Sequence, residues 1–323
     1  MLKEKVLIFA EVSSSQITPV FFELLAKARS LTDGEVACVA LGHNIGPMIE
    51  QLKTSGIDTV YALDHERLAI YNPEYYSAAL VAVCKMYQPG ILFFGATSIG
   101  EELAPTLGIK LNTGVAAHCM DVHLTEDGRL AQLVPAFGGK VVGEIFTPNT
   151  LPKIISIKPG VLPFTGMQPK KCIVELIDKS VLEFPSAITP SGVVCNIPGG
   201  KEIDKADFVA CTGYGIPSSA TWGKVQRLTE MLDGAAGYTR PVIDFGFVNG
   251  ETNMVGTSGK SIRPKLYLGL GISGSTHHVC GMKDSGVIIA VNTDPNAEIF
   301  NVCDYKIIGD GEQILDAILE ELA

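Results

Sequence analysis

The chain has 323 residues, of which 46% are hydrophobic and 19% charged, and its formal net charge is −10. This balance is typical of a globular protein, and the length is enough for two domains with a sizeable core in each. An acidic chain is a poor candidate for nucleic-acid binding, which needs a basic face, so we expect no nucleic-acid partner. No run approaches the roughly 18 continuous apolar residues of a membrane span, so we expect no membrane insertion.

The eight cysteines are dispersed and contain no C-x-x-C pair, which argues against a zinc ribbon or a disulfide scaffold. Four of them lie in or beside apolar runs and are expected to be small core residues: Cys38, Cys211, Cys280 and Cys303. The first twelve residues, MLKEKVLIFAEV, have the pattern of a lysine-flanked strand rather than of a signal peptide. These features predict a protein of the reducing cytoplasm.

Four short apolar runs, separated by helix-like segments, predict βαβ units around a parallel sheet. They lie at residues 5–12, 35–41, 59–64 and 90–97. Thr18 and Asn72 each precede a proline, and their side chains are predicted to cap helices that begin at Pro19 and Pro73. The turn after the fourth run, GATSIGEELAP, lacks the lysine of a Walker loop, so we predict a strand-to-helix turn capped by Ser98 and assign no site there.

From residue 114 to 177 the pattern changes to short strands separated by D-G, G-G and proline, which is typical of antiparallel hairpins. His118 and His123 lie among these strands without ligand partners at metal-site spacing, and we expect them on strand faces. Residues 186–205 are dense in Pro, Gly, Ser and Thr. They predict a linker between a first domain of residues 1–185 and a second domain of residues 206–323.

The second domain contains a segment, 265–295, with the pattern of a dinucleotide-binding site. It opens with the apolar run KLYLGL, of the length of a buried parallel strand, and continues into a G-x-G-x-x-G turn. The glycines of this turn, which allow the backbone to approach a phosphate closely, are Gly269, Gly271 and Gly274. A second apolar strand, VIIAVN, ends at Asn292 and Asp294, about 20 residues beyond the last glycine. A glycine-rich turn without a ligand is the alternative.

The residues that fill the turn indicate which dinucleotide it binds. Two adjacent histidines, His277 and His278, are unusual for an NAD site, which normally continues into an apolar helix. G-I-S-G, a histidine four residues later, G-M-K-D-S and a strand that ends in N-x-D-P together resemble the FAD domain of the alpha subunit of electron-transfer flavoproteins. The resemblance extends to EIFNVCDYKIIGD, V-G-T-S-G-K and T-R-P-V-I-D, and more loosely over the whole chain.

This resemblance implies an α/β fold, with an N-terminal parallel-sheet domain that carries an added antiparallel part and a C-terminal Rossmann-like FAD-binding domain. It implies an electron carrier with one FAD in this chain, in a heterodimer with an electron-transfer flavoprotein beta subunit that holds a second FAD or AMP. The N-terminal domain would contact that subunit. Electrons would pass between a dehydrogenase of the acyl-CoA dehydrogenase type and an acceptor. Electron bifurcation from NADH is open, and the context of Thr239, Arg240, Thr257 and Ser258 leans towards it.

The resemblance also implies roles for residues at the flavin end of the site. Thr239 and Arg240 would lie beside the isoalloxazine, where a permanently charged, planar guanidinium suits the negative charge of a reduced flavin. Tyr214 stands between two glycines where the family usually has arginine, so stacking or hydrogen bonding replaces an ionic role. In the segment Val255, Gly256, Thr257 and Ser258, the Ser258 hydroxyl would approach flavin N5. The alternative for Arg240 is a surface salt bridge.

His278 matches a family histidine placed near flavin O2, and a buried structural histidine is its alternative. The resemblance assigns further cofactor contacts to Ser273, Gly274, Ser275, Thr276 and His277, of which Ser273, Ser275 and backbone amides would bind pyrophosphate. Asn292 would lie at the adenosine end, and Asp310 with Gly311 near the same ligand. A different class of function, an NAD-dependent dehydrogenase, would use the turn from Gly269 to Gly274 and Asp294 as its ribose-binding acid.

Overall fold

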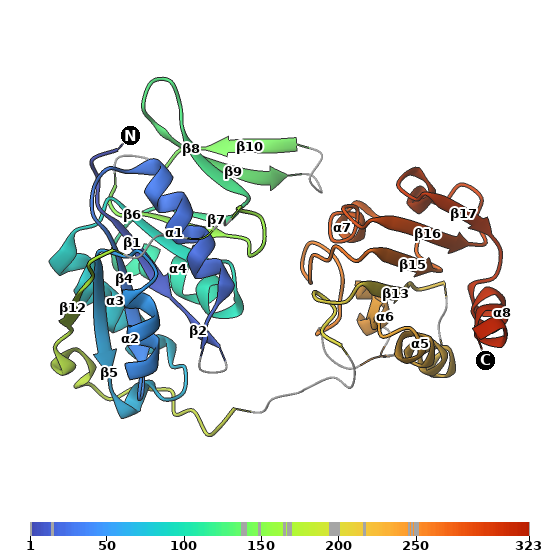
Figure 1. Ribbon diagram of the computed structural model, residues 1–323, viewed down its shortest axis with the longest axis horizontal. Helices are drawn as coiled ribbons and strands as arrows, with labels where there is room; N and C mark the ends of the chain where they lie inside the picture. The colour runs from blue at the N-terminus through green and yellow to red at the C-terminus, as the bar shows by residue number, and fades with distance from the viewer. Residues whose placement is uncertain are drawn as a thin grey trace. The chain divides into compact units, whose positions relative to one another are not determined.

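The computed structural model describes residues 2–13, 16–136, 141–147, 150–163, 166, 170–193, 201–215, 218–244, 246, 248 and 252–322. Its chain divides into two compact units, here called the N-terminal unit, which extends to residue 193, and the C-terminal unit, which begins at residue 201 (Figure 1). Residues 194–200 of the predicted linker lie outside the described residues. Among the residues that the structure describes, no helix is both long and apolar enough to cross a membrane.

A seven-stranded sheet in the order β12-β5-β4-β1-β6-β11-β7 forms the centre of the N-terminal unit, and every neighbouring pair in it is parallel. Its strands are β1 (Val6–Ala10), β4 (Val36–Gly42), β5 (Thr59–Asp64), β6 (Ile91–Gly95), β7 (Val115–Cys119), β11 (Lys153–Ile157) and β12 (Ile173–Leu176). Every residue of β1, β4 and β6 is buried, as expected for strands covered on both faces. The predicted parallel sheet is confirmed.

Helices cover both faces of this sheet. Helices α1 (Pro19–Leu31) and α2 (Gly46–Lys53) pack on one face, and α3 (Pro73–Tyr87) and α4 (Ser98–Lys110) pack on the other. Two short 3-10 helices, η1 (Glu66–Leu68) and η3 (Lys179–Leu182), lie beside the second face. The apolar stripes that predicted α1 and α3 face the core at the spacing of a helical period.

The helix caps differ from the predictions at two places. Asn72 caps α3 as predicted, because its side chain accepts two backbone N–H groups of the first turn. The prediction was wrong for Thr18, whose side chain makes no cap hydrogen bond; its backbone carbonyl closes the first turn of α1 by accepting the Phe21 amide at 3.0 Å. It was also wrong for Ser98, since Thr97 caps α4 by accepting the Gly100 amide at 3.1 Å.

The segment from 114 to 177 is only partly antiparallel. Strands β8 (Asp121–Leu124), β9 (Leu130–Ala136) and β10 (Val141–Ile145) form an antiparallel sheet in the order β10-β9-β8. The prediction of hairpins was wrong for β7, β11 and β12, which join the large sheet in parallel. Turn residues report where the chain reverses, whereas pairing depends on distant strands: Lys153 of β11 pairs with Ile91 of β6.

Strand β10 is the outer strand of the antiparallel sheet and is exposed. Its exposed apolar side chains, together with the residue that follows it, are Val141, Val142, Ile145 and Phe146. Because successive strand residues point to opposite faces, Val141 and Val142 expose both faces of β10. A separate two-stranded ribbon pairs β2 (Val12–Ser13) with β3 (Gln16–Ile17).

The C-terminal unit contains an entirely parallel sheet in the order β14-β13-β15-β16-β17. Its strands are β13 (Phe208–Thr212), β14 (Ala235–Tyr238), β15 (Leu266–Leu270), β16 (Val287–Asn292) and β17 (Tyr305–Ile308). Helices α5 (Ser219–Met231) and α8 (Gly311–Leu322) cover one face (Figure 1). Loops with the short helices α7 (Thr276–Val279) and η4 (Glu298–Asn301) pack on the other face, and α6 (Arg240–Asp244) follows β14. The Rossmann-like prediction is confirmed.

Both parallel sheets contain a point where the strand order reverses. In the C-terminal unit the chain forms β13, adds β14 on one side, and then crosses to add β15 on the other side. In the N-terminal unit β1 is likewise flanked by β4 and β6. Ligands of open α/β sheets bind in the crevice at the carboxyl ends of two such strands. We call these places the C-terminal switch point (β13 and β15) and the N-terminal switch point (β1 and β6).

Candidate dinucleotide-binding site

Two glycine turns meet backbone to backbone at the C-terminal switch point. The Gly213 amide, directly after β13, donates to the Leu270 carbonyl at 2.8 Å, and the Gly215 amide donates to the Gly271 carbonyl at 3.1 Å. A Cβ added at Gly213 would stand 2.2 Å from the Gly271 oxygen. Only glycine fits this approach, so both predicted glycine turns belong to one structure.

The carbonyl groups of the turn after β15 face the protein. The oxygens of residues 271–273 accept hydrogen bonds from the Gly215 amide at 3.1 Å, the Asn292 side chain at 2.9 Å and the Ile299 amide at 3.0 Å. Because the C=O and N–H of a planar trans peptide point in opposite directions, the amides of residues 272–274 point away from these donors. Contacts from three separate loops therefore fix the backbone of this turn.

Gly274 packs on η4 at the far side of this turn. Its φ is +91°, which L side chains rarely adopt, and an added Cβ would stand 2.0 Å from the Ile299 nitrogen. The side chains of Ser273 and Ser275, on either side, are exposed at the same edge, and Thr276 then opens α7. The turn therefore combines close backbone packing with exposed hydroxyl groups, both of which a phosphate-binding turn uses.

The predicted flavin-end segment, residues 255–258, is joined to the start of α7. The backbone amide and the hydroxyl of Thr257 donate to the His277 carbonyl at 2.8 and 3.1 Å. Gly256 has a φ of +144°, and an added Cβ would stand 2.7 Å from the same oxygen. The Val255 side chain is buried, whereas the side chains of Thr257, Ser258 and His277 are exposed. The two predicted regions therefore form one surface.

His278 is buried beneath this surface, with 4% of its area exposed. Its Nδ1 lies 3.0 Å from the Val255 carbonyl oxygen and its Nε2 lies 2.7 Å from the Tyr267 hydroxyl. Since a carbonyl only accepts, Nδ1 carries the proton, and Nε2 accepts from the tyrosine. Burial lowers the pKa of His278 from 6.5 to about 4, so the ring is neutral at pH 7. The alternative of a buried structural histidine describes this geometry.

Thr239 and Arg240 lie at the carboxyl end of β14, beside the switch point. Thr239 is buried, and its amide donates to the Thr212 carbonyl at 3.0 Å. Arg240 begins α6 with 63% of its side chain exposed, and its Nε lies 3.8 Å from the Asp244 carboxylate. This is the geometry of the surface-salt-bridge alternative. Tyr214 stands on the glycine turn with 54% of its area exposed.

The polar residues assigned to the adenosine end make hydrogen bonds within the protein. Asn292 donates to the Ile272 carbonyl, and its side-chain oxygen accepts the Asp294 amide at 2.9 Å. The Asp294 carboxylate accepts a backbone amide of its own turn at 2.9 Å. Asp310 caps α8, because its carboxylate accepts the amides of the second and third residues of that helix. Gly311 is the buried first residue of α8.

Sequence reasoning missed Tyr267 and Ile299. Tyr267 is a fully buried residue of β15 whose hydroxyl orients His278. A tyrosine in an apolar strand is ordinarily a core residue, and the eleven-residue separation from His278 matches no local period. The backbone of Ile299 closes the glycine turn from η4, 25 residues after Gly274, and an apolar side chain gives no signal of such a backbone contact.

The structure brings most of the predicted residues to one edge of the sheet. Strands β13 to β17 are parallel, so the loops at their carboxyl ends share that edge. The hydroxyls of Ser273 and Ser275 and the side chains of Thr257, Ser258 and Arg240 are exposed. Among the described residues, no group of three or more His, Cys, Asp and Glu side chains could hold a metal ion. The arrangement is that of an α/β protein whose glycine turns and exposed polar residues meet at the C-terminal switch point.

Comparisons with known proteins identify the dinucleotide. The model of the electron transfer flavoprotein domain matches residues 6–182, and that of the electron transfer flavoprotein FAD-binding domain matches residues 202–283. The electron transfer flavoprotein subunit alpha of Thermoanaerobacterium thermosaccharolyticum is 34% identical over 326 residues, which cover 98% of this chain and 96% of that protein. The subunit alpha of Clostridium acetobutylicum is 31% identical over 322 residues, with 98% and 96% covered.

A relative with another name matches almost as well. Subunit LctC of lactate dehydrogenase (NAD(+),ferredoxin) from Acetobacterium woodii is 31% identical over 320 residues, which cover 97% of this chain and 75% of that protein. The chain belongs to the electron transfer flavoprotein family, as an alpha subunit. Its C-terminal unit is the flavin-binding domain of that family.

Proposed function

We propose that this chain binds one FAD along the carboxyl edge of the C-terminal sheet and carries its electrons. The observation that supports this placement is the glycine turn after β15, where Gly274 packs closely on η4 and the side chains of Ser273 and Ser275 are exposed. The FAD pyrophosphate would lie against the hydroxyls of Ser273 and Ser275 and backbone amides of this turn. The adenosine would extend towards the ends of β16 and β17, where Asn292 and Asp310 hold the loops in place.

The isoalloxazine would lie over the surface formed by residues 255–258 and the start of α7. When bound, FAD supplies reversible one- and two-electron chemistry, and the protein binds, orients and tunes it. Arg240 would place a permanent positive charge near the ring, and the exposed Ser258 hydroxyl would offer a hydrogen bond to N5. The exposed phenol of Tyr214 would supply stacking or hydrogen bonding at the glycine turn.

His278 would act from beneath the ring. In the observed geometry its Nδ1 proton goes to the Val255 carbonyl, and its Nε2 accepts from Tyr267. Donation from Nε2 to a flavin oxygen requires the imidazole to carry a proton on Nε2 and the Tyr267 hydroxyl to release that nitrogen. Tyr267 therefore sets whether His278 can donate a hydrogen bond towards the flavin.

The proposed assembly is a heterodimer with an electron-transfer flavoprotein beta subunit, which would hold a second FAD or AMP. A dehydrogenase of the acyl-CoA dehydrogenase type would exchange electrons with this chain, and the C-terminal unit would swing about the linker between partners. The name of the Acetobacterium relative, a lactate dehydrogenase that uses NAD(+) and ferredoxin, supports bifurcation from NADH as a further proposal. A cytoplasmic location suits the described cysteines, none of which forms a disulfide.

No observation favours the alternative of an NAD-dependent dehydrogenase. The helix after the glycine turn, α7, has four residues, whereas an NAD turn continues into a helix that packs on the sheet. The Asp294 carboxylate, which that alternative assigns to a ribose, accepts a backbone amide of its own turn.

Purification with the companion subunit tests the proposal. We expect a yellow heterodimer, with one FAD released from this chain in addition to any nucleotide of the companion. Absorbance of the released flavin against protein concentration measures the ratio. A colourless heterodimer that stays without flavin after reconstitution with FAD, but takes up NADH, would establish the alternative.

A further inference from the structure

The end of the predicted first domain and the first residues of the predicted linker are bound to the N-terminal unit. We call residues 184–188 the strap. The Phe184 ring lies 5.1 Å from the Tyr75 ring of α3, at an interplanar angle of 54°. The Tyr75 hydroxyl also donates to the Phe184 carbonyl at 3.4 Å. The strap therefore begins with a side-chain and a backbone contact to the same residue.

The side-chain amide of Asn72 caps α3 with its oxygen and binds the strap with its nitrogen. Its side-chain oxygen accepts the amides of Glu74 and Tyr75 at 2.9 and 3.3 Å. Its side-chain nitrogen donates to the Ser186 hydroxyl oxygen and to the Ile188 carbonyl, both at 3.0 Å. The side chain is fully buried, so a lost partner would leave a buried polar group unsatisfied.

Glu74, in the first turn of α3, provides the second attachment. Its carboxylate accepts the Ala187 amide at 2.8 Å and a short hydrogen bond from the Ser186 hydroxyl. The hydrogen bond from Ser186 holds the pKa of Glu74 below its usual range, so the carboxylate is charged at pH 7. Hydrogen bonds to a charged acceptor are stronger than those between neutral groups.

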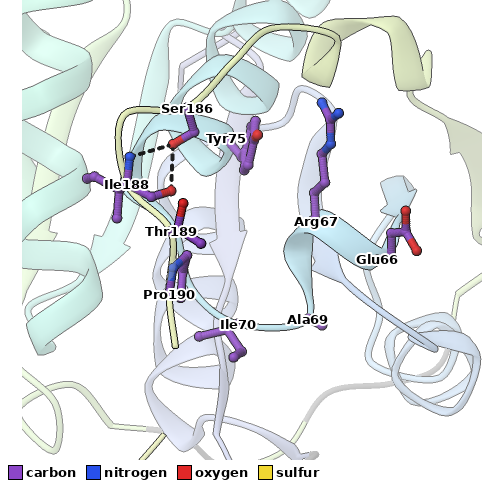
Figure 2. Close-up of a pocket in the computed structure, with 9 residues that line it drawn as sticks. All are labelled: Glu66, Arg67, Ala69, Ile70, Tyr75, Ser186, Ile188, Thr189 and Pro190. Atoms are coloured by element: carbon purple, nitrogen blue, oxygen red, sulfur yellow. Dashed lines mark hydrogen bonds between the residues drawn. The ribbon is translucent and has the colours of Figure 1, made fainter. Parts of the chain in front are cut away.

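Ser186 completes the strap from inside. Its oxygen accepts the Ile188 amide at 3.1 Å and lies 2.9 Å from the Ile188 carbonyl oxygen (Figure 2). A hydroxyl has one proton, and the Glu74 carboxylate is the stronger acceptor for it. The hydroxyl thus joins the strap to α3 and fixes its turn at the same time.

Beyond the contact of Phe184 with Tyr75, polar contacts rather than apolar burial hold the strap. Ile188 is 44% exposed. A pocket of about 270 Å³ separates the strap and the two residues after it from the loop that begins at η1 (Figure 2). It is lined by Glu66, Arg67, Ala69, Ile70, Tyr75, Ser186, Ile188, Thr189 and Pro190. Because little apolar surface fixes the strap here, the bonds from Asn72 and Glu74 should determine its position.

We propose that the strap is mechanically part of the N-terminal unit, and that any swing of the C-terminal unit begins beyond Ile188. This inference rests on the proposed function, which requires such a swing. The hinge would then leave out the first residues of the predicted linker and be shorter than that linker. Asn72 and Glu74 are then positioning residues that set where the flavin-binding domain leaves its neighbour.

Hydrogen exchange on the FAD-loaded heterodimer tests the attachment. The Ala187 and Ile188 amides both donate to side chains in the strap contacts, so we expect them to exchange slowly in the unaltered protein. Asn72→Asp keeps an oxygen to cap α3 but loses both donors to the strap. Glu74→Ala removes the carboxylate that accepts from the Ala187 amide and the Ser186 hydroxyl. Each variant should speed exchange of these two amides by about tenfold or more. A change of this size is expected when one or two such hydrogen bonds are lost.

The matched control is Glu50→Ala, which removes an exposed carboxylate from α2 that pairs only with the neighbouring Lys53 in the described contacts. It should leave exchange of the strap unchanged. Exchange of Ala187 and Ile188 at the rate of an unstructured peptide in the unaltered protein would overturn the proposal. Unchanged protection in both strap variants would overturn the assignment to Asn72 and Glu74.

A covalent lock tests where the motion begins. A disulfide between Glu74→Cys and Ser186→Cys, verified by mass spectrometry, would fix the strap to α3. If the strap never leaves α3, electron transfer to the dehydrogenase partner should proceed at the same rate with the lock closed or reduced. A rate that falls on closure and recovers on reduction would show that the strap lifts, and would overturn the proposal. Failure of the proposed function is separate, because it appears as absence of FAD in either state.

Discussion

The two switch points of this protein have the same topology and opposite chemistry. At the C-terminal switch point, glycine backbones pack together and the side chains of Ser273 and Ser275 are exposed. At the N-terminal switch point, a side-chain pair joins the two loops: Thr97, after β6, donates a short hydrogen bond to the Glu11 carboxylate, after β1. Burial raises the pKa of Glu11 above its usual value. The first place is built from glycine backbone and hydroxyl groups, and the second contains a carboxylate.

The difference shows that strand order alone does not make a nucleotide site. Neutral hydroxyl and backbone N–H groups can bind a phosphate, whereas a half-buried carboxylate repels one. The chemistry therefore lies in the loops after the strands, as expected where one fold serves several functions. The sequence already indicated this contrast, since the turn after β6 lacks the lysine of a Walker loop.

Gly274→Ala should disrupt the C-terminal switch point, and we expect the largest effect from this substitution. Alanine is strained at a φ of +91°, and its Cβ would stand 2.0 Å from the Ile299 nitrogen. We expect loss of bound FAD and about 3 to 5 kcal/mol less stability in the C-terminal unit. Flavin content and urea unfolding measure both effects.

Gly128→Ala is the matched control for that substitution. Gly128 has a φ of +78°, but an added Cβ would meet nothing within 4 Å. It should cost only about 1 kcal/mol, the strain of the left-handed backbone, and leave FAD bound. Equal flavin loss in both variants would show that the close approach of Gly274 has no special role.

The buried histidine should make the C-terminal unit sensitive to acid. The unfolded chain takes up a proton on His278 near pH 6.5, whereas the folded protein does so only near pH 4. Stability from the neutral ring is therefore complete above pH 6.5 and decreases as pH falls to 4, by about 3 kcal/mol. Unfolding measured across this range should show a steeper loss in the unaltered protein than in His278→Gln. The exposed His277→Gln should keep the steep loss.

Arg240→Ala sharpens the comparison at the flavin end. If the guanidinium lies near the ring, its removal should lower the FAD midpoint potential by about 20 to 40 mV, because a reduced flavin carries negative charge. Arg240→Lys should retain most of the potential. Arg227→Ala, which removes an exposed arginine from α5, is the control in a redox titration. An unchanged potential in Arg240→Ala would limit Arg240 to its ion pair with Asp244.

Glu11→Gln tests the N-terminal side and should have the smallest effect. A raised pKa means that the charged carboxylate is penalised in the folded protein, so stability decreases as pH rises through the folded pKa. Glutamine still accepts from Thr97 and carries no charge. We expect a rise in the Tm of the N-terminal unit of about 1 to 2 °C at pH 7. A lower Tm would show that the charge itself stabilises the switch point.

Much of the fold could be predicted, because its signals are local. Continuous apolar runs gave the strands β1, β4, β5 and β6, and Asn72 before a proline gave the start of α3. The parallel pairing of β7, β11 and β12 could not be predicted, since their partners are distant in sequence. Residues 186–188 were predicted as part of a linker for the same reason: their contacts come from Asn72 and Glu74, more than 100 residues earlier.

The candidate site was predictable to a similar extent. The spacing of glycines and hydroxyl residues predicts a phosphate-binding turn, so the two turns could be located in the sequence. The orientation of His278 could not, because it depends on Tyr267 and the Val255 carbonyl, which only the folded chain brings together. Asn292 and Asp310 were assigned to a ligand by resemblance; what the structure shows is that their side chains hydrogen-bond to backbone groups and hold loops in place.

This polypeptide should tend to aggregate when it is expressed without its companion subunit, because of β10. The strand exposes valines on both faces at the rim of a small sheet, and such strands add to one another across molecules. Insoluble material would then accumulate even if each domain folds correctly. A lysine in place of Val142 should keep the lone subunit dispersed, because a charged rim strand resists stacking.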